Sequence, residues 1–271
     1  MKKRSVLLGL VLVLLVGAVP ALAITWGLPD EDNLYQNVGA MIASFEDETY
    51  PVCTGTLIDE KVFLTAGHCT EYVEFGLAEG TIKAVYVSFD YDPMARGAKW
   101  LDVAEIITHP DYWWGPTSNP HDVGVLILDK PAKKVTPATL PPEGFLDQLL
   151  ADGELHDGSD RARFTVVGYG GTLYWPPPEI VYGDKRQYAE SEYLKLLKAW
   201  LHLSQNQATG DGGTCYGDSG GPSFWVEEDG TEILVGITSW GDAQCVSSGF
   251  NYRVDIPDTL DFVYEVIGSL E

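Results

Sequence analysis

The chain alternates between short apolar stretches and polar, turn-forming segments over most of its length. Residues 84–89 read Ala-Val-Tyr-Val-Ser-Phe, which alternates with the period of two expected of a half-buried strand. Residues 124–128 form a continuous apolar run of strand length. Stretches of these kinds predict eight short strands, at 38–43, 53–58, 62–65, 84–89, 100–108, 122–128, 164–170 and 233–240.

Four segments depart from this pattern. Residues 130–160 are rich in Pro, Gly and acidic residues and predict a linker between two halves of the chain. Residues 173–178 end in successive prolines, which fit neither a helix nor a central strand, so we expect an extended loop. Residues 256–267 predict a C-terminal helix with Asp258 near its start. Residues 186–206 are ambiguous, because their apolar residues recur with near-helical spacing.

The first 23 residues have the pattern of a secretory signal peptide. Basic residues at positions 2–4 precede an apolar run over 6–19, and Ala21-Leu22-Ala23 offers the small residues of a cleavage site. A retained membrane anchor is the alternative, but the run is short for a spanning helix. No cysteine follows the cleavage site to carry a lipid. We therefore expect a secreted, extracellular protein that begins at Ile24.

Length, charge and cysteines narrow the class of protein. At 271 residues the chain can form one unit with a full core. Its formal net charge is −23, and this becomes −26 when residues 1–23 are removed, since they hold three of the 17 basic residues and none of the 40 acidic ones. Such a charge disfavours nucleic acid and anionic membranes as partners. Four cysteines in an exported chain predict two disulfides with three possible connectivities, and the absence of a CxxC pair disfavours a metal site.

The stretch Thr214-Cys215-Tyr216-Gly217-Asp218-Ser219-Gly220-Gly221-Pro222 carries the strongest chemical signal. A serine hydroxyl becomes a good nucleophile only when a base takes its proton and donors stabilise the resulting oxyanion. Glycines on both sides of Ser219 allow positive φ and close substrate approach, so that the amides of Gly217 and Ser219 can point the same way. For Gly-Asp-Ser alone, a glycine-rich turn with a surface serine is the favoured interpretation, but not for the whole run.

This stretch resembles the nucleophile motif of the trypsin-like serine proteases, which have the chymotrypsin fold. A second motif lies upstream, since Leu64-Thr65-Ala66-Gly67-His68-Cys69 is similar to that family's catalytic-histidine segment, with Gly67 where alanine is more usual. The resemblance is close around Ser219 and patchy from about residue 27 to residue 206. It implies that His68 is the general base and Ser219 the nucleophile of a catalytic triad.

The third member of such a triad is a carboxylate that leads into an apolar strand and orients the imidazole. Asp122 precedes the run 123–128, which resembles the family's aspartate strand, and the order His, Asp, Ser is the family's order. Asp102 and Asp111 are the rivals, but neither precedes an uninterrupted apolar run. The resemblance therefore implies a triad of His68, Asp122 and Ser219, with the amides of Gly217 and Ser219 as the oxyanion hole.

The resemblance also implies the fold. It is all-β, with two six-stranded antiparallel Greek-key barrels and a C-terminal helix. Residues 186–206 must then supply two strands, because the second barrel cannot close without them, so we favour strands over a helix there. The expected divisions of the peptidase domain 24–271 are a first barrel at 24–130, a linker at 131–160, a second barrel at 161–255 and a helix at 256–271. The expected disulfides join Cys53 to Cys69 and Cys215 to Cys245.

Cleavage after Ala23 bears on activation. In many relatives a free apolar N-terminus places its ammonium beside the aspartate that precedes the nucleophile, and so orders the oxyanion hole. Here these residues are Ile24 and Asp218, although Ile24-Thr25-Trp26-Gly27 matches the usual Ile-Val-Gly-Gly only loosely. The hypothesis is that signal cleavage alone creates the active N-terminus, without a separate propeptide. The alternative is that Ile24 begins a flexible leader.

The implied activity is hydrolysis of protein or peptide substrates through an acyl-enzyme, by a monomer without cofactor or metal. Gly213 occupies the pocket-floor position where trypsin-type enzymes carry an aspartate, which disfavours cleavage after Lys or Arg. Ser239, Trp240 and Gly241 resemble the segment that pairs with the substrate backbone and whose serine hydrogen-bonds the triad aspartate. Gly241 and Gly249 would leave the pocket open, so we predict cleavage after large apolar or aromatic residues.

Two other functions fit the same sequence. One is a catalytically silent secreted binding protein on this scaffold, and the other is an esterase using the same triad. Glu71, Glu74 and Glu79 lie roughly where some relatives hold calcium, but a solvated acidic loop is the favoured interpretation. Trp113 and Trp114 are candidates either for a substrate subsite or for packing on the barrel rim. His109 and His121 are read as structural and as solvated, respectively.

Overall fold

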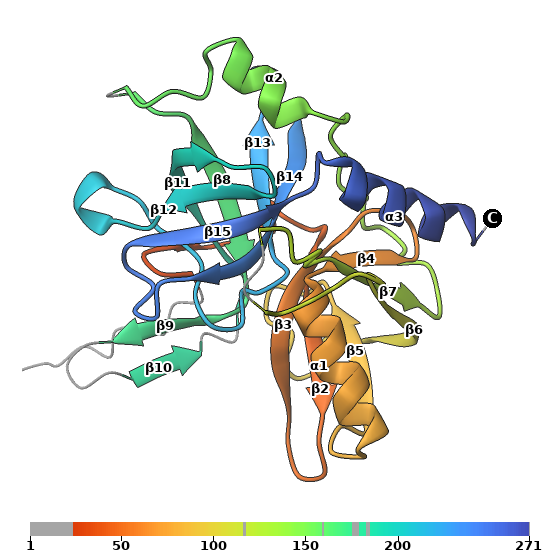
Figure 1. The fold of residues 1–271 in the computed structure, drawn as a ribbon. Helices are drawn as coiled ribbons and strands as arrows, with labels where there is room; N and C mark the ends of the chain where they lie inside the picture. The colour runs from red at the N-terminus through yellow and green to blue at the C-terminus, as the bar shows by residue number, and fades with distance from the viewer. Residues whose placement is uncertain (1–23, 116–117, 159, 175–178, 183–184, 271) are drawn as a thin grey trace, which may run out of the picture.

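The computed structural model describes residues 24–115, 118–158, 160–174, 179–182 and 185–270. The predicted signal peptide at 1–23 and the prolines at 176–178 lie outside these ranges. The described chain forms two antiparallel barrels side by side, with the C-terminal helix α3, Pro257–Gly268, lying next to the first (Figure 1). No described helix is both long and apolar enough to cross a membrane.

Six strands close the first barrel in the order β2-β3-β4-β7-β6-β5, with β5 pairing back onto β2. Every pairing is antiparallel. The apolar run 124–128 becomes β7, which is buried along its whole length. The strands are β2 (Val38–Ser44), β3 (Thr49–Leu57), β4 (Val62–Thr65), β5 (Ala84–Ser88), β6 (Leu101–Thr108) and β7 (Gly124–Leu128).

The second barrel follows the order β8-β11-β12-β15-β14-β13, and β8 pairs with both β11 and β13, which closes it. Its strands are β8 (Arg163–Gly168), β11 (Gln187–Leu196), β12 (Trp200–Ser204), β13 (Pro222–Val226), β14 (Glu232–Gly241) and β15 (Ser248–Arg253). The short strand β1 (Leu28–Pro29) extends the edge of β11. The strands β9 (Gly171–Tyr174) and β10 (Glu179–Tyr182) form a separate hairpin. The expected fold of two six-stranded antiparallel barrels is confirmed.

The ambiguous segment 186–206 contains the strands β11 and β12, so the strand interpretation is confirmed. Alternate residues along β11 are buried from Gln187 to Tyr193, as the period of a strand requires. The helical spacing in the sequence joins residues from the two strands and from the turn between them. The spacing is therefore helical by chance, because it runs across the turn between two strands. The pairing of β11 with β8 and β12 decides between strands and a helix.

Two helices lie where the sequence predicted none. Helix α1, Gly67–Ala78, begins one residue before His68 and contains Glu71 and Glu74, so the expectation of an acidic loop there is wrong. Helix α2, Phe145–Ala151, lies inside the predicted linker. It is held by Leu146, which is fully buried and whose amide donates to Asp255 Oδ2 at 2.8 Å.

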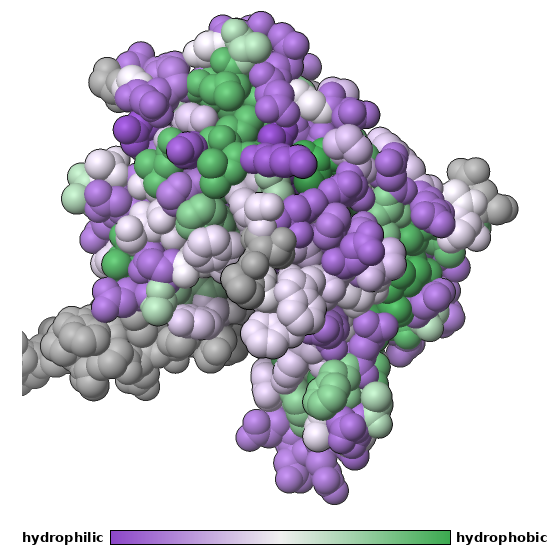
Figure 2. Space-filling view, viewed as in Figure 1, coloured by the Kyte–Doolittle hydropathy of each residue, from purple (hydrophilic) through white to green (hydrophobic). Residues whose placement is uncertain are grey.

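The two barrels share polar contacts at their junction. The backbone N of Thr54 donates to the carbonyl of Ser219 at 2.8 Å, and its hydroxyl accepts from the amide of Tyr169 at 3.2 Å. Arg186 is fully buried, and its guanidinium donates to the Asp30 carboxylate at 2.7 Å. Hydrophilic residues cover much of the face in Figure 2, as expected of a chain with a net charge of −23.

Candidate active site

The three predicted triad residues lie at the ends of secondary-structure elements from both barrels. His68 is the second residue of α1, just after β4, and Asp122 precedes β7, which pairs with β4. Ser219 precedes β13 of the second barrel. The disulfide between Cys53 and Cys69 ties the start of α1 to β3, and the expected pairing is confirmed. The junction between the barrels therefore brings these segments together.

Gly67, the departure from the usual histidine motif, has a local explanation. A Cβ atom at this position would lie 2.9 Å from Cδ2 of Tyr112 and 3.1 Å from the backbone N of Val123. The Tyr112 ring therefore occupies the space that an alanine methyl would need. This ring also lines the cavity next to His68.

The Asp122 carboxylate contacts both the backbone and the imidazole of His68. The backbone N of His68 donates to Asp122 Oδ1 at 2.9 Å, and its Nδ1 lies 3.0 Å from Oδ2. The hydroxyl of Ser239 also donates to Oδ2, as the resemblance implied. The Asp122 side chain is 5% exposed, whereas that of His68 is 33% exposed. The arrangement fixes Nδ1 as the donor to the carboxylate and leaves Nε2 for proton transfer.

The electrostatics of this pair favour the ion pair over the neutral pair. Burial alone would raise the pKa of Asp122, but the charge and hydrogen bonds of His68 and the Ser239 hydroxyl outweigh it, so the pKa is lowered. Burial alone would lower the pKa of His68, but the Asp122 carboxylate outweighs it and the pKa is raised. An imidazolium formed when His68 accepts a proton is thereby stabilised.

The backbone around Ser219 is held in an open turn. Gly217 and Gly220 have φ values of 96° and 83°, in the left-handed region that favours glycine. The Gly220 amide donates to Thr238 at 2.8 Å, and the Gly217 carbonyl accepts from the Thr54 hydroxyl at 3.1 Å. Within the described part of the chain, the amides of Gly217 and Ser219 donate to no backbone acceptor. Both are available to an incoming oxyanion.

Two cavities meet at Ser239 and Trp240. The larger, of about 370 Å³, is lined by His68 and Asp122 together with four aromatic residues. The smaller, of about 230 Å³, is lined by Ser219, Thr214, Thr238 and Gly241, and the Cys215–Cys245 disulfide forms part of its wall. Both cavities also contain Ser239 and Trp240 in their walls. The four aromatic residues of the larger cavity are Tyr112, Trp114, Trp200 and Trp240.

The predicted pocket glycines divide into two groups. Gly241 borders the smaller cavity, whereas Gly213 and Gly249 are absent from its described lining. The space beside both of these glycines is filled by Gln205, a residue that the sequence analysis did not single out. No motif marks Gln205, since it is only the first residue after β12. Trp200 lies in the segment 186–206, whose apolar residues the sequence analysis considered only for their spacing.

Asp218 and Ile24 are both fully buried. The Asp218 carboxylate accepts from the amides of Gly170 and Cys215, each at 2.8 Å. Burial raises the pKa of Asp218 to about 8, against the opposing effect of these two bonds. Thr25 exchanges hydrogen bonds of 2.8 and 3.0 Å with Gly213, which seats the segment after Ile24 beside the nucleophile loop.

The remaining candidates have structural surroundings. His121, expected to be solvated, is half-buried and stacks on His109 with ring centroids 4.9 Å apart, so that expectation is wrong. Trp114 lines the larger cavity and is 75% exposed, while Trp113 does not border it. Among the described residues, the one cluster with metal-ligand spacing joins His68 to Cys53 and Cys69, whose sulfurs are bonded to each other.

Comparison with known proteins agrees with this geometry. The family model described as Trypsin matches residues 30–262. The chain is 28% identical over 237 residues to vitamin K-dependent protein C of Mus musculus, covering 80% of this chain and 46% of that protein. It is 29% identical over 207 residues to lectizyme of Glossina austeni, covering 72% and 70% respectively. It is 27% identical over 205 residues to coagulation factor IX of Cavia porcellus, covering 74% and 68%. The chain thus spans about half the length of protein C.

Proposed function

The chain belongs to the trypsin family, whose model matches residues 30–262, and on this basis we propose that it is a secreted serine endopeptidase. It acts on protein or peptide substrates as a monomer, without cofactor or metal. The signal-peptide pattern of residues 1–23 supports secretion, and the net charge of −23 supports the absence of nucleic-acid and anionic-membrane partners.

The reaction uses the triad as follows. Ser219 Oγ attacks the scissile carbonyl carbon while His68 Nε2 takes the hydroxyl proton, and the C–O bond of a tetrahedral intermediate forms. His68 then gives that proton to the leaving amine as the C–N bond breaks, which leaves an acyl-enzyme. Water, activated by His68, hydrolyses the ester and regenerates Ser219. Asp122 keeps the imidazole in the required tautomer and stabilises the imidazolium.

The oxyanion of each intermediate is held by the amides of Gly217 and Ser219. Their lack of a backbone acceptor supports this role, because a preorganised donor acts most strongly when no other partner competes for it. Removing one such donor lowers the rate by about a hundredfold to a thousandfold. The single observation that carries the proposal is the His68–Asp122–Ser239 arrangement at the junction of two cavities, one of which contains Ser219.

Activation follows from cleavage before Ile24. The released α-ammonium pairs with Asp218, whose buried carboxylate has no basic side chain within ion-pair distance among the described residues. The full burial of Ile24 and the seating of Thr25 on Gly213 support this role. Signal cleavage alone then yields the active form. Edman sequencing of the secreted protein tests this, and a first residue other than Ile24 would overturn it.

Substrate preference follows from the two cavities. The described lining of the smaller one has one carboxylate, Asp242, whose oxygens already accept from the backbone amides of residues 244 and 246–248. The smaller one binds the residue before the scissile bond, the P1 residue, and favours large apolar or aromatic side chains over Lys or Arg, since Gly213 supplies no carboxylate. The larger one, with Tyr112, Trp114, Trp200 and Trp240, favours apolar residues further towards the substrate N-terminus. Ser239, Trp240 and Gly241 pair with the substrate backbone.

A fluorophosphonate probe tests the proposed function. We expect one covalent adduct, mapped to Ser219 by peptide mass spectrometry, and none in the variants Ser219→Ala and His68→Ala. Hydrolysis of a peptide amide, in addition to an ester, then separates an endopeptidase from an esterase. A folded, correctly processed protein that forms no adduct would overturn the proposal in favour of a silent binding protein.

A further inference from the structure

Gln205 is buried behind Thr214, one of the residues that line the smaller cavity. Gln205 follows β12 directly and is only 2% exposed. Its backbone N donates to the carbonyl of Ser247 at 2.9 Å. Its Nε2 donates to the carbonyl of Thr214 at 2.8 Å and lies 3.3 Å from that residue's hydroxyl. Thr214 itself lines the cavity. The carboxamide of Gln205 therefore contacts Thr214 on the side that faces away from the cavity.

The same side chain fills the space that two glycines leave. A Cβ on Gly213 would lie 2.2 Å from Cγ of Gln205 and 2.7 Å from its Nε2. A Cβ on Gly249 would lie 2.9 Å from that Nε2. A methyl group on Gly213 would overlap the middle of the Gln205 side chain, and one on Gly249 would force its carboxamide to move. Glycine at both positions therefore makes room for Gln205 where it lies. This explains why the described lining of the cavity reaches Thr214 and Thr238 but neither glycine.

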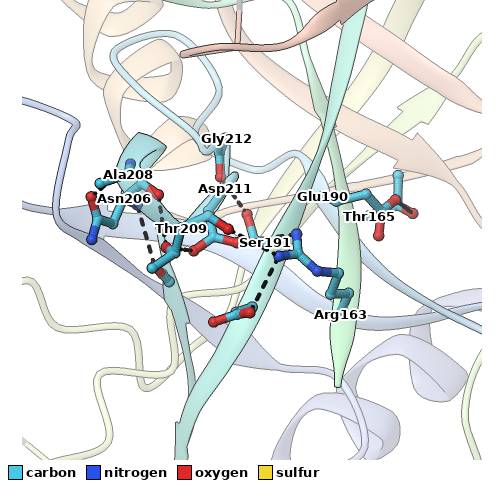
Figure 3. A network of polar contacts seen from close by, with 11 residues as sticks. Arg163, Thr165, Glu190, Ser191, Asn206, Ala208, Thr209, Asp211 and Gly212 are labelled. Atoms are coloured by element: carbon cyan, nitrogen blue, oxygen red, sulfur yellow. Dashed lines mark hydrogen bonds and ion pairs between the residues drawn. The ribbon is translucent and has the colours of Figure 1, made fainter. Parts of the chain in front are cut away.

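The loop between Gln205 and Gly213 makes polar contacts with the neighbouring strands, and Figure 3 shows those of Asp211 and Gly212. The Asp211 carboxylate accepts from the Thr209 hydroxyl at 2.7 Å and forms an ion pair with Arg163 at 3.1 Å. The Ser191 hydroxyl donates to the carbonyl of Gly212 at 2.7 Å. These bonds connect the loop to β8 and β11. The Gln205 side chain is itself held by the hydrogen bond from its Nε2 to Thr214, which opposes its displacement when a longer side chain enters.

We propose that Gln205 is a specificity-determining residue. By filling the space behind Thr214, between Gly213 and Gly249, it ends the P1 pocket there and limits its depth. The inference rests on the proposed function, since it concerns the same site. Among the large apolar and aromatic P1 side chains of the proposed function, it ranks the aliphatic ones of the length of Leu and Met above the longer rings of Phe, Tyr and Trp. Lys and Arg are disfavoured as well, because their side chains are longer than the shortened pocket can hold.

The size of the effect follows from the volume removed. One methylene more or less in an apolar pocket changes kcat/KM by about tenfold to 200-fold. Replacing Gln205 by glycine removes four non-hydrogen atoms beyond Cβ, and so deepens the pocket by more than one methylene. We therefore expect the ratio of kcat/KM for a P1 Phe substrate to that for a P1 Leu substrate to rise at least about tenfold.

The test compares four proteins on peptide anilides that differ only at P1, with Leu, Met, Phe, Tyr or Lys. The variants are Gln205→Gly, Gln205→Met, which keeps the volume but not the amide, and Gln207→Ala, an exposed glutamine nearby as control. Each protein is titrated with the fluorophosphonate so that rates refer to intact sites. We expect the Phe-to-Leu ratio to rise only in Gln205→Gly, and to stay near the wild-type value in Gln205→Met and Gln207→Ala.

The outcomes separate this inference from the proposed function. A wild-type protein that neither reacts with the probe nor cleaves any anilide would overturn the proposed function. Wild-type cleavage that is fastest after Phe or Tyr, or an unchanged ratio in an active Gln205→Gly variant, would overturn only the inference. A Phe-to-Leu ratio that rises equally in Gln205→Met would also overturn the inference, because the hydrogen bond from the Gln205 carboxamide to Thr214, and not the depth of the pocket, would then set the preference. If Gln205→Gly fails to titrate, Gln205→Ala replaces it with the same expectation.

Discussion

Replacing Arg186 with methionine is expected to lower the free energy of unfolding by about 3–5 kcal/mol, the usual effect of removing one partner of a buried ion pair. Arg186 and Asp30 are both fully buried, with Nε and Oδ2 2.7 Å apart. The guanidinium also donates to the carbonyls of Val38 and Phe89, each at 3.0 Å. These groups join the N-terminal segment to the first barrel, and methionine restores the volume without any donor.

The loss arises mainly from the carboxylate that remains. Without Arg186, the remaining partners of the Asp30 carboxylate within the described ranges are the amides of Leu34 and Tyr35, at 2.6 and 3.2 Å. An unpaired buried charge is far more unfavourable than a neutral amide in the same place. The double variant Arg186→Met/Asp30→Asn should therefore be more stable than Arg186→Met alone, by about 1 kcal/mol or more.

The assay is urea unfolding followed by tryptophan fluorescence in a Ser219→Ala background, which removes self-digestion. Arg96→Met is the matched control, since Arg96 is exposed, and its unfolding midpoint should stay near that of the parent. A domain of this size shifts its melting temperature by about 2–4 °C per kcal/mol, which offers a second readout. A loss below about 1 kcal/mol for Arg186→Met, or a double variant less stable than the single one, would refute the argument.

Three further predictions concern the site. Gly67→Ala should destabilise the fold by about 1–3 kcal/mol through overpacking against Tyr112, and adding Tyr112→Ala should recover part of the loss in a melting experiment. Activity requires neutral His68, whose pKa is raised by the Asp122 carboxylate, so kcat/KM should fall as the pH drops through that pKa. In Asp122→Asn the rate should be lower, and the acidic limb of the pH–rate profile should move to lower pH. In the uncleaved chain, the folded protein keeps Asp218 protonated up to about pH 8, whereas the unfolded chain loses this proton near pH 3.8. The free energy of unfolding should therefore fall as the pH rises between these values. Urea unfolding at pH 5 and pH 8 measures this fall, which should be smaller in Asp218→Asn.

The sequence by itself determined the features that depend on short segments and their order. Period-two and continuous apolar runs predicted most of the strands, because burial on a pleated sheet imposes that spacing locally. The motifs around His68 and Ser219 identified the family, and with it the two barrels and both disulfides. The turn around Ser219 was also foreseeable, since glycines flank the serine and two of the neighbouring glycines adopt positive φ.

The tertiary structure decided what depends on residues far apart in the chain. Strand pairing, and not periodicity, made 186–206 two strands. Gly67 is explained by the ring of Tyr112, 45 positions later in the numbering. In the sequence, Gly213 and Gly249 suggested an open pocket, whereas in the structure the Gln205 side chain fills the space beside both glycines. A sequence records which side chains are absent at a position, but only the packed chain shows which distant atoms occupy the volume they leave.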